Sequence, residues 1–223
     1  MFVKSAQTSL GAILLALVAI PLTCAADDIA GVPSSDQGLE RLRTYLDNFQ
    51  SLRAKFRQEV VNQDLELVEE AAGQVILQKP GRFVWNYEQP YERVITSNGE
   101  KIWLYEADLE QVTVRRFDAG IGETPASLLT GTADVLDHFE YVEATSVEGL
   151  ELIHLKPRSP ESDFESIILG FNGSNLVQIA LLDRLEQRTR LYLSEIESPA
   201  SVDEKDFVFE IPDGVDVIGE TEL

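Results

Sequence analysis

"QKPGRFVWNYEQPYERVITSNGEKIWLYEADLEQVTV", from Gln78 to Val114, decides the fold and holds both tryptophans of the chain, Trp85 and Trp103. Apolar and polar residues alternate along it in short runs, and the pairs Pro-Gly, Gln-Pro and Asn-Gly separate these runs. Alternation with a period of two indicates β-strands, and such pairs are typical of turns. The stretch therefore predicts a series of consecutive antiparallel hairpins.

The same alternation begins at about Gln58 and resumes at "EYVEATSV", with "FVFEIP" expected as the closing strand. Several of these strands are apolar on both faces: Ile167 and Leu169 point away from Ile168. A sheet of about eleven strands with one wet face does not need so many apolar residues. Either more protein packs on the sheet, or the sheet curls around an apolar space.

Two helical regions accompany the strands. Ser35 or Asp36 is the expected N-cap of a long helix, and "TPASLL" and "DVLDHF" predict two short helices inserted mid-chain. A three-and-four spacing places the apolar residues of the long helix in one stripe: Leu39, Leu42, Leu46, Phe49, Leu52 and Phe56. The sequence thus predicts a mostly β fold with some α: one large twisted antiparallel sheet, one long helix before it and two short inserted helices.

The first residues have the features of a secretory signal peptide. Lys4 precedes the apolar run "LGAILLALVAIPL", and "TCAAD" ends in small residues that suit cleavage after Ala25 or Ala26. Pro21 and Thr23 do not fit a lipoprotein signal around Cys24, so the cysteine is expected to leave with the signal. We therefore expect residues 1–26 to be removed and residues 27–223 to form a single domain in an exported, cysteine-free protein.

Composition and motifs give no catalytic signature. The 223 residues carry a net charge of -21, which disfavours nucleic acid as a partner. His138 and His154 have no partner at metal-ligand spacing, and "GIGETP" lacks the lysine of a phosphate loop. Acidic residues are so numerous that a paired-carboxylate glycosidase is neither supported nor excluded. No metal and no cofactor is expected, and we expect a non-enzyme.

The string "GQVILQKPGRFVWNY", followed by "QPYERVITSNGEKIWLY" and "LEQVTV", resembles the LolA family of periplasmic lipoprotein carriers. "FQSLRAKFRQEV", "TPASLL" and "FVFEIPDGVDVI" resemble the family's first helix and strand, its lid helix and its closing segment. The resemblance implies an open half-barrel, a single curved antiparallel sheet of about eleven strands. Its concave face is covered by the long helix and the lid helices, and acyl chains lie between them. The absence of a lipidation cysteine separates the chain from LolB, the lipid-anchored receptor of the same fold.

The family implies a monomeric carrier in the periplasm of a Gram-negative bacterium, loaded by the LolCDE complex of the inner membrane and unloaded by a LolB-type receptor. Lys79 stands where family members have an arginine that clasps the lid, and a solvated strand-end charge is the alternative role. Gly120, Gly122 and Gly131 are the expected lid hinges. We expect the acyl cavity to be lined by Leu77, Phe83, Trp85 and Trp103 of the strands, Phe49 and Phe56 of the long helix, and Leu128 and Leu129 of the first inserted helix.

Other functions remain compatible with the same pattern. The aromatic stripe Phe83, Trp85 and Tyr87 is also what an ordinary core presents, and alternation alone does not choose. An exported enzyme acting on lipid or glycan would use the trough as its substrate groove and would place titratable groups inside it. A lipoprotein-sensing or lipid-binding module of the same fold is a second alternative.

Overall fold

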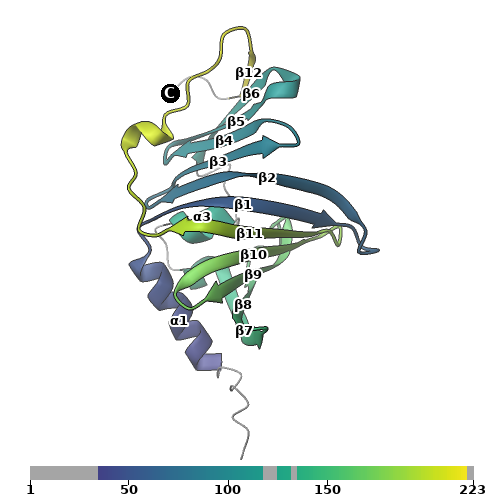
Figure 1. Cartoon of the computed structure of the whole chain (residues 1–223), viewed down its shortest axis with the longest axis vertical. Helices are drawn as coiled ribbons and strands as arrows, with labels where there is room; N and C mark the ends of the chain where they lie inside the picture. Colours follow the sequence, from purple (N-terminus) through teal and green to yellow (C-terminus); the bar gives the residue numbers. More distant parts are fainter. Residues whose placement is uncertain (1–34, 118–124, 132–134, 220–223) are drawn as a thin grey trace, which may run out of the picture. The chain divides into compact units, whose positions relative to one another are not determined.

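The computed structural model describes residues 35–117, 125–131 and 135–219, which form a twelve-stranded sheet and several short helical segments. Among the described residues no helix is long and apolar enough to cross a membrane. The elements, shown in Figure 1, are α1 (Ser35–Asn48), β1 (Ser51–Val61), β2 (Leu67–Gln78), β3 (Arg82–Gln89), β4 (Arg93–Asn98), β5 (Lys101–Glu106), η1 (Ala107–Leu109), β6 (Gln111–Arg116), α3 (Pro125–Thr130), α4 (Val135–His138), β7 (Phe139–Val147), β8 (Leu150–Pro157), β9 (Phe164–Asn172), β10 (Asn175–Asp183), β11 (Arg188–Glu197), η2 (Glu204–Phe207) and β12 (Asp216–Gly219).

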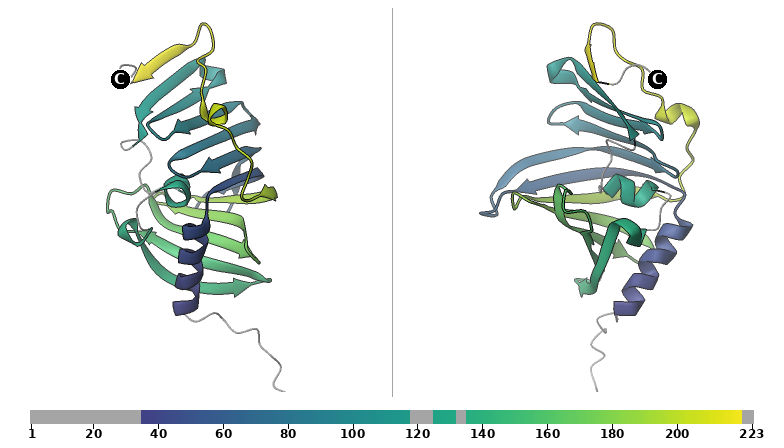
Figure 2. Two further views of the ribbon diagram at one scale, coloured as in Figure 1. Left: turned by 90° about the vertical axis from the view of Figure 1, so that its left-hand side faces the viewer. Right: turned by 180° about the vertical axis from the view of Figure 1, so that it is seen from behind.

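The strands form one open sheet in the order β12-β6-β5-β4-β3-β2-β1-β11-β10-β9-β8-β7. All neighbouring strands are antiparallel except β12, which runs parallel to β6. Because the two edge strands, β7 and β12, do not pair with each other, the sheet curves without closing into a barrel (Figure 2). The expected open half-barrel is confirmed, with twelve strands instead of about eleven.

The predicted long helix is shorter than its apolar stripe. α1 ends at Asn48, Phe49 follows it, and Phe56 lies in β1 and not on the helix. A spacing of four residues, as between Leu52 and Phe56, suits one face of a helix and equally one face of a strand. In β1 these two side chains are buried on the same side as Ala54, which resolves the ambiguity in favour of the strand.

The sheet face that carries α1 and α3 is called the inner face, and its apolar side chains form one buried cluster with those of the two helices (Figure 2). Alternate residues of most strands point into this inner cluster, as the period of two requires. Its members are Leu42, Leu46, Phe49, Leu52, Ala54, Phe56, Val75, Leu77, Phe83, Trp85, Ile102, Ala126, Leu128, Leu129, Phe139, Ala144, Ile153, Leu155, Ile167, Leu169, Phe171, Leu176, Ile179, Leu191 and Leu193.

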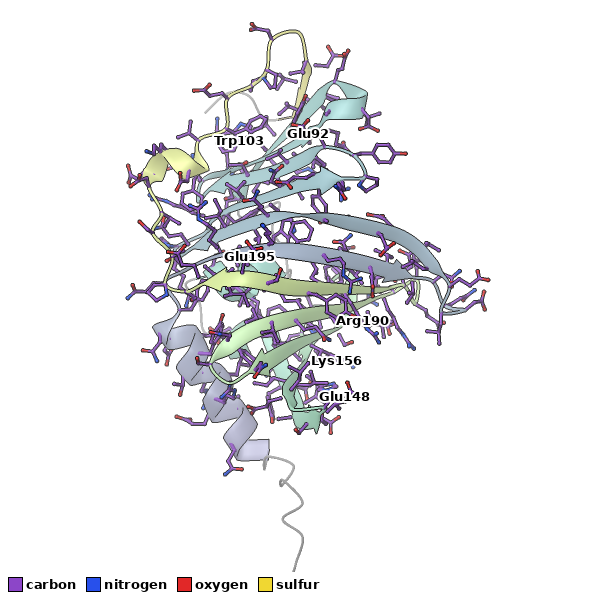
Figure 3. All side chains as sticks on the ribbon, viewed as in Figure 1. Glu92, Trp103, Glu148, Lys156, Arg190 and Glu195 are labelled. Carbon is purple, nitrogen blue, oxygen red and sulfur yellow. The ribbon has the colours of Figure 1, made fainter. Side chains whose placement is uncertain are left out.

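The opposite, outer face is covered at one end by the C-terminal segment, residues 198–219. Figure 3 shows this segment beside Trp103 on the side of the sheet away from α3. Phe209 stacks on Trp103 at 6.5 Å between ring centroids, and Phe207 is 1% exposed. The strands here are apolar on both faces because the chain's own C-terminus buries the second face.

The prediction of a closing strand at "FVFEIP" is wrong. Phe207 ends η2, and the residues up to Val215 form no strand. Phe209 packs on Trp103 and Tyr105 of β5, on the outer face, instead of aligning beside a sheet edge. The pairing with β6 is made later, by β12.

Replacing Phe207 with Ala should lower the free energy of unfolding by about 3 to 5 kcal/mol. The reason is that this side chain of the C-terminal segment is fully buried. The neighbouring substitution Val208→Ala is the matched control, since Val208 is 64% exposed and should change stability by less than about 0.5 kcal/mol. Urea unfolding of both variants measures the difference. Equal effects would show that the segment does not pack on the sheet in solution.

Candidate functional site

Seven of the eight side chains predicted for the acyl cavity lie together in the inner cluster. Each is less than 9% exposed. They come from α3, from the sheet and from the residue that follows α1: Leu128 and Leu129; Phe56, Leu77, Phe83 and Trp85; and Phe49. The structure therefore brings these residues to one face, as the sequence predicts.

Trp103 is the exception, and its prediction as a cavity residue is wrong. The antiparallel register places Phe83 opposite Ser97 and Ser97 opposite Ile102, so Ile102 is the β5 residue on the inner face. Trp103 pairs with Thr96 and points to the outer face, where it packs against Phe209. Aromatic character suggested a shared site for the two tryptophans, but strand register separates them.

The aromatic residues of the inner face meet across three neighbouring strands. Phe56 of β1 lies 5.7 Å from Trp85 and 5.0 Å from Tyr87, measured between ring centroids. Trp85 pairs with Val75 in β2, which places its indole at the centre of the sheet. Its Nε1 is buried without a hydrogen-bond partner among the described residues. The surface beneath the helices is thus broad and almost wholly apolar.

The two covering helices are fastened to the β2–β3 turn by different residues. Lys79 Nζ donates a hydrogen bond of 2.6 Å to the carbonyl oxygen of Leu46, in the last turn of α1. The backbone N–H of Gly81 donates to the carbonyl oxygen of Thr130, the last residue of α3, at 2.9 Å. Lys79, the predicted lid clasp, therefore holds the N-terminal helix, and a backbone group holds the inserted helix.

Of the predicted hinge glycines, Gly131 directly follows α3 and lines a cavity of about 310 Å³ together with Gly81 and Phe117. Gly120 and Gly122 lie outside the described residues.

Polar groups close the end of the inner face that lies away from α1. Tyr87 donates a hydrogen bond to Gln58 at 3.2 Å, and the Arg93 guanidinium stacks 4.3 Å above the Tyr87 ring. Burial raises the pKa of Tyr87, against a smaller opposing effect of Arg93. A cavity of about 240 Å³ beside them is lined by four carboxylates: Glu69, Glu92, Glu106 and Asp108.

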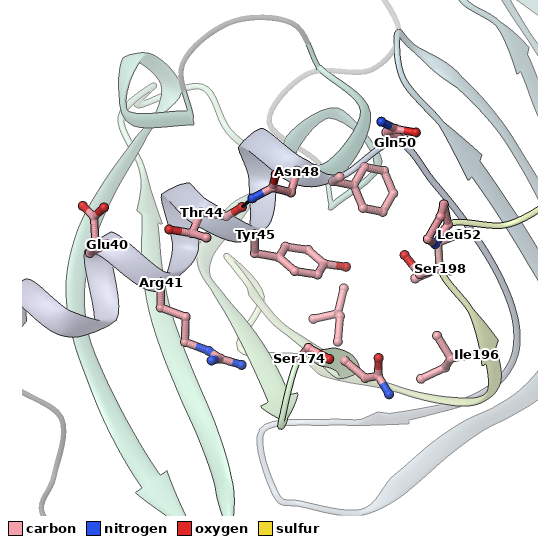
Figure 4. A pocket seen from close by; sticks show the side chains of 14 residues that line it. Glu40, Arg41, Thr44, Tyr45, Asn48, Gln50, Leu52, Ser174, Ile196 and Ser198 are labelled. Carbon is pink, nitrogen blue, oxygen red and sulfur yellow. Dashed lines mark hydrogen bonds between the residues drawn. The ribbon is translucent and has the colours of Figure 1, made fainter.

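The end of the inner face near α1 has a larger cavity than the opposite end. A cavity of about 590 Å³ lies between α1, the β9–β10 turn and the end of β11 (Figure 4). Phe49 is the predicted cavity residue that lines it, and sequence reasoning missed Tyr45 and Ile196. Tyr45 stands four residues before Phe49, so the spacing that selected Phe49 could also have selected Tyr45.

Titratable groups do not gather at the centre of this surface. The described residues contain no group of three or more His, Cys, Asp or Glu side chains that could hold a metal ion. The charged side chains discussed above, Lys79, Arg93 and Glu69, lie at the ends of strands or at the rim of the inner face. Such a surface, built from hydrophobic side chains, is suited to binding hydrocarbon.

Comparison with protein families identifies this architecture. The family described as outer membrane lipoprotein carrier protein LolA matches residues 47–210. The chain belongs to the LolA family. An outer-membrane lipoprotein carrier protein of Chromohalobacter salexigens is 38% identical over 205 residues, covering 92% of this chain and 94% of that protein. Another, from Nitrosospira multiformis, is 38% identical over 184 residues and covers 82% of this chain and 89% of its own.

Solved structures show a similar fold. The crystal structure of an uncharacterised conserved protein from Thermus thermophilus superimposes with a TM-score of 0.50 at 14% identity. The match covers 82% of this chain and 97% of that chain. At this identity the likeness concerns the arrangement of the LolA-type sheet and helices alone.

The environment of Lys79 gives a testable electrostatic difference from Lys55. Burial lowers the pKa of Lys79 below 10.5, with Asp47 acting in the opposite direction, whereas the hydrogen bond to Glu195 raises the pKa of Lys55 above 10.5. Side-chain NMR of the lysines, titrated from about pH 8 to about pH 12, should find Lys79 deprotonating before Lys55. The unfolded chain holds the Lys79 proton more tightly, so this residue makes folding more favourable as pH rises from the lowered pKa towards 10.5. The reverse order of titration would contradict the partly buried position of Lys79.

Proposed function

We propose that this protein carries lipoproteins across the periplasm from the inner to the outer membrane and shields their acyl chains beneath α1 and α3. Membership of the LolA family and the names of its relatives support this assignment. The observation that best supports the proposed function is the apolar inner face of the sheet, over which the helices α1 and α3 lie.

The need for such a cover follows from the cost of exposing hydrocarbon. Each methylene in water costs about 0.8 kcal/mol, so one acyl chain of about sixteen carbons costs on the order of 10 kcal/mol. A lipoprotein therefore does not cross an aqueous compartment unaided. A carrier must bury the chains and still release them, which requires a cover that can move.

The inserted helix α3 is the part of the cover that is easiest to displace. It has six residues, and its described hydrogen bond to the rest of the protein is the one between Gly81 and Thr130. Lifting α3 removes Leu128 and Leu129 from the inner cluster and exposes Phe83 and Trp85 to cargo. We propose Gly131, which directly follows α3, as a hinge for this movement; Gly120 and Gly122, the other predicted hinges, lie outside the described residues.

We assign no reaction and no cofactor to the protein. A LolCDE-type transporter in the inner membrane would load it, and a LolB-type receptor at the outer membrane would unload it. The alternative of an exported lipid- or glycan-acting enzyme requires titratable groups inside the trough, and the inner cluster is built from hydrophobic side chains. The carrier is therefore the function that fits the described surface better.

Export to the periplasm of a Gram-negative bacterium would use residues 1–26 as a signal peptide, leaving 27–223 as the carrier domain. Intact mass and N-terminal sequencing of the periplasmic protein should find a chain that begins just after Ala25 or Ala26. The mature protein should also fail to react with a thiol reagent, because Cys24 is the single cysteine of the sequence. Retention of Cys24 with an attached lipid would contradict the soluble carrier.

Replacing Phe83 with Glu should abolish cargo uptake, because a carboxylate placed on the inner face must lose its hydration when acyl chains bind. We expect release of a triacylated lipoprotein from spheroplasts to fall at least about tenfold, which corresponds to about 1.4 kcal/mol. Val84→Glu is the matched control, since Val84 is the next residue of β3 and points to the outer face.

A second variant, Leu128→Gln, places a polar group on the short helix α3 and leaves the sheet unchanged. Circular dichroism establishes that each variant keeps its strands. The proposal fails if both folded inner-face variants release as much lipoprotein as the Val84→Glu control.

A further inference from the structure

Tyr45 is a partly buried side chain of α1 that packs against the inner cluster. Its ring packs against Phe171 at 4.9 Å and Phe49 at 5.9 Å between centroids. The hydroxyl oxygen is buried and has no hydrogen-bond partner among the residues that the structure describes. Burial raises the pKa of Tyr45, so the phenol stays neutral and keeps its proton to donate.

Tyr45 lines the cavity of about 590 Å³ beside α1. Figure 4 shows the Tyr45 side chain crossing this cavity, with its oxygen directed towards Leu52 and Ser198. Phe49, Leu52 and Ile196 supply apolar walls, and exposed polar residues such as Ser174 form the rim. Phe49 and Leu52 also belong to the inner cluster, so the cavity borders the proposed acyl site.

An unpaired buried hydroxyl is unfavourable for folding, since the group has lost water without gaining a partner. A phenylalanine would fill the same space without that cost. A ligand that has a hydrogen-bond acceptor would therefore explain why this position has the hydroxyl group of a tyrosine and not a phenylalanine. The walls indicate that this acceptor is attached to hydrocarbon.

The charges around the cavity favour a neutral acceptor. Its described lining contains two charged side chains, Glu40 and Arg41. Arg41 is engaged: it forms an ion pair with Glu151 at 2.7 Å and donates a hydrogen bond to the Gly173 carbonyl. A carboxylate or phosphate group would find no uncommitted cation on this lining, whereas an ester or amide carbonyl needs a single donor.

The other end of the inner face is less suitable for a carbonyl group. The cavity there is lined by Glu69, Glu92, Glu106 and Asp108, which are acceptors themselves and repel the electron-rich oxygen of an ester. The two ends are thus chemically different. The α1 end offers a neutral donor within apolar walls.

We propose that the Tyr45 hydroxyl donates a hydrogen bond to a carbonyl group that joins an acyl chain to the N-terminal cysteine of the cargo. This inference rests on the proposed carrier function and adds an orientation to it. The acyl tails extend from this cavity towards Phe83 and Trp85, and the cargo polypeptide leaves the carrier between α1 and the β9–β10 turn.

The test uses the purified mature protein, a synthetic triacylated lipopeptide and the substitution Tyr45→Phe, which removes only the oxygen. The variant should bind the lipopeptide about 3- to 10-fold more weakly, the usual effect of one neutral hydrogen bond. Tyr91→Phe is the matched control, because Tyr91 is 70% exposed and lies outside this cavity. It should bind as the unsubstituted protein does.

Infrared spectra of the bound lipopeptide identify the acceptor. The ligand carries a carbon-13 label either at its ester carbonyls or at its amide carbonyl. A hydrogen bond lowers the stretching frequency of the labelled group, and this shift should disappear in Tyr45→Phe. The label that responds distinguishes an ester from an amide acceptor, and either response supports the proposal.

Thermal unfolding of the empty protein separates this role from a structural one. Tyr45→Phe should melt at the same temperature as the unsubstituted protein or higher, since an unpaired group is removed. A lower melting temperature, unchanged affinity, or weaker binding without loss of a carbonyl shift each overturns the role of Tyr45. Failure of the unsubstituted protein to bind the lipopeptide at all is a different result, which refutes the carrier function itself.

Discussion

The inner face of the sheet is apolar along most of its strands and has no second sheet to pack against, so it must be covered by helices. α1 covers one end through Leu42 and Leu46, with Phe49 just after the helix, and α3 covers the middle through Leu128 and Leu129. Their attachments are unequal. α1 is fixed by Lys79 and by the ion pair of Arg41 with Glu151, whereas α3 is joined to the β2–β3 turn by one described backbone hydrogen bond. The described attachments are thus more numerous for α1 than for α3, the part of the cover that is proposed to move.

This arrangement accounts for how a carrier can both bind and release a very apolar ligand. In the structure the side chains of Leu128 and Leu129 belong to the same cluster as Phe83 and Trp85. Binding of acyl chains exchanges one set of apolar contacts for another, so the net affinity is a difference and not the full cost of exposing a chain to water. Release then needs no reaction, only an acceptor that offers a more favourable environment.

The outer face of the sheet also has apolar side chains that must be buried. Strands β5 and β6 carry apolar side chains on this side too, and Phe209 of the C-terminal segment packs on those of β5, while Phe207 is buried nearby. Ion pairs between Arg53 and Asp206 and between Arg82 and Glu204 accompany this packing, although they are partly exposed and contribute little. The C-terminal segment therefore packs on the face opposite the one proposed to bind acyl chains.

The sequence by itself determined the sheet, most of its turns and seven of the eight inner-face residues, because alternation and turn residues act locally along the chain. It also supported the family through contiguous motifs. Only the tertiary structure decided which strands pair, in which register, and therefore which face of the sheet each side chain occupies. Register between β4 and β5 sent Trp103 to the outer face, and pairing with β2 made Phe56 a strand residue. Tyr45 became a candidate ligand contact because α1 lies over strands more than a hundred residues away in the chain, and which groups find partners there depends on three-dimensional packing.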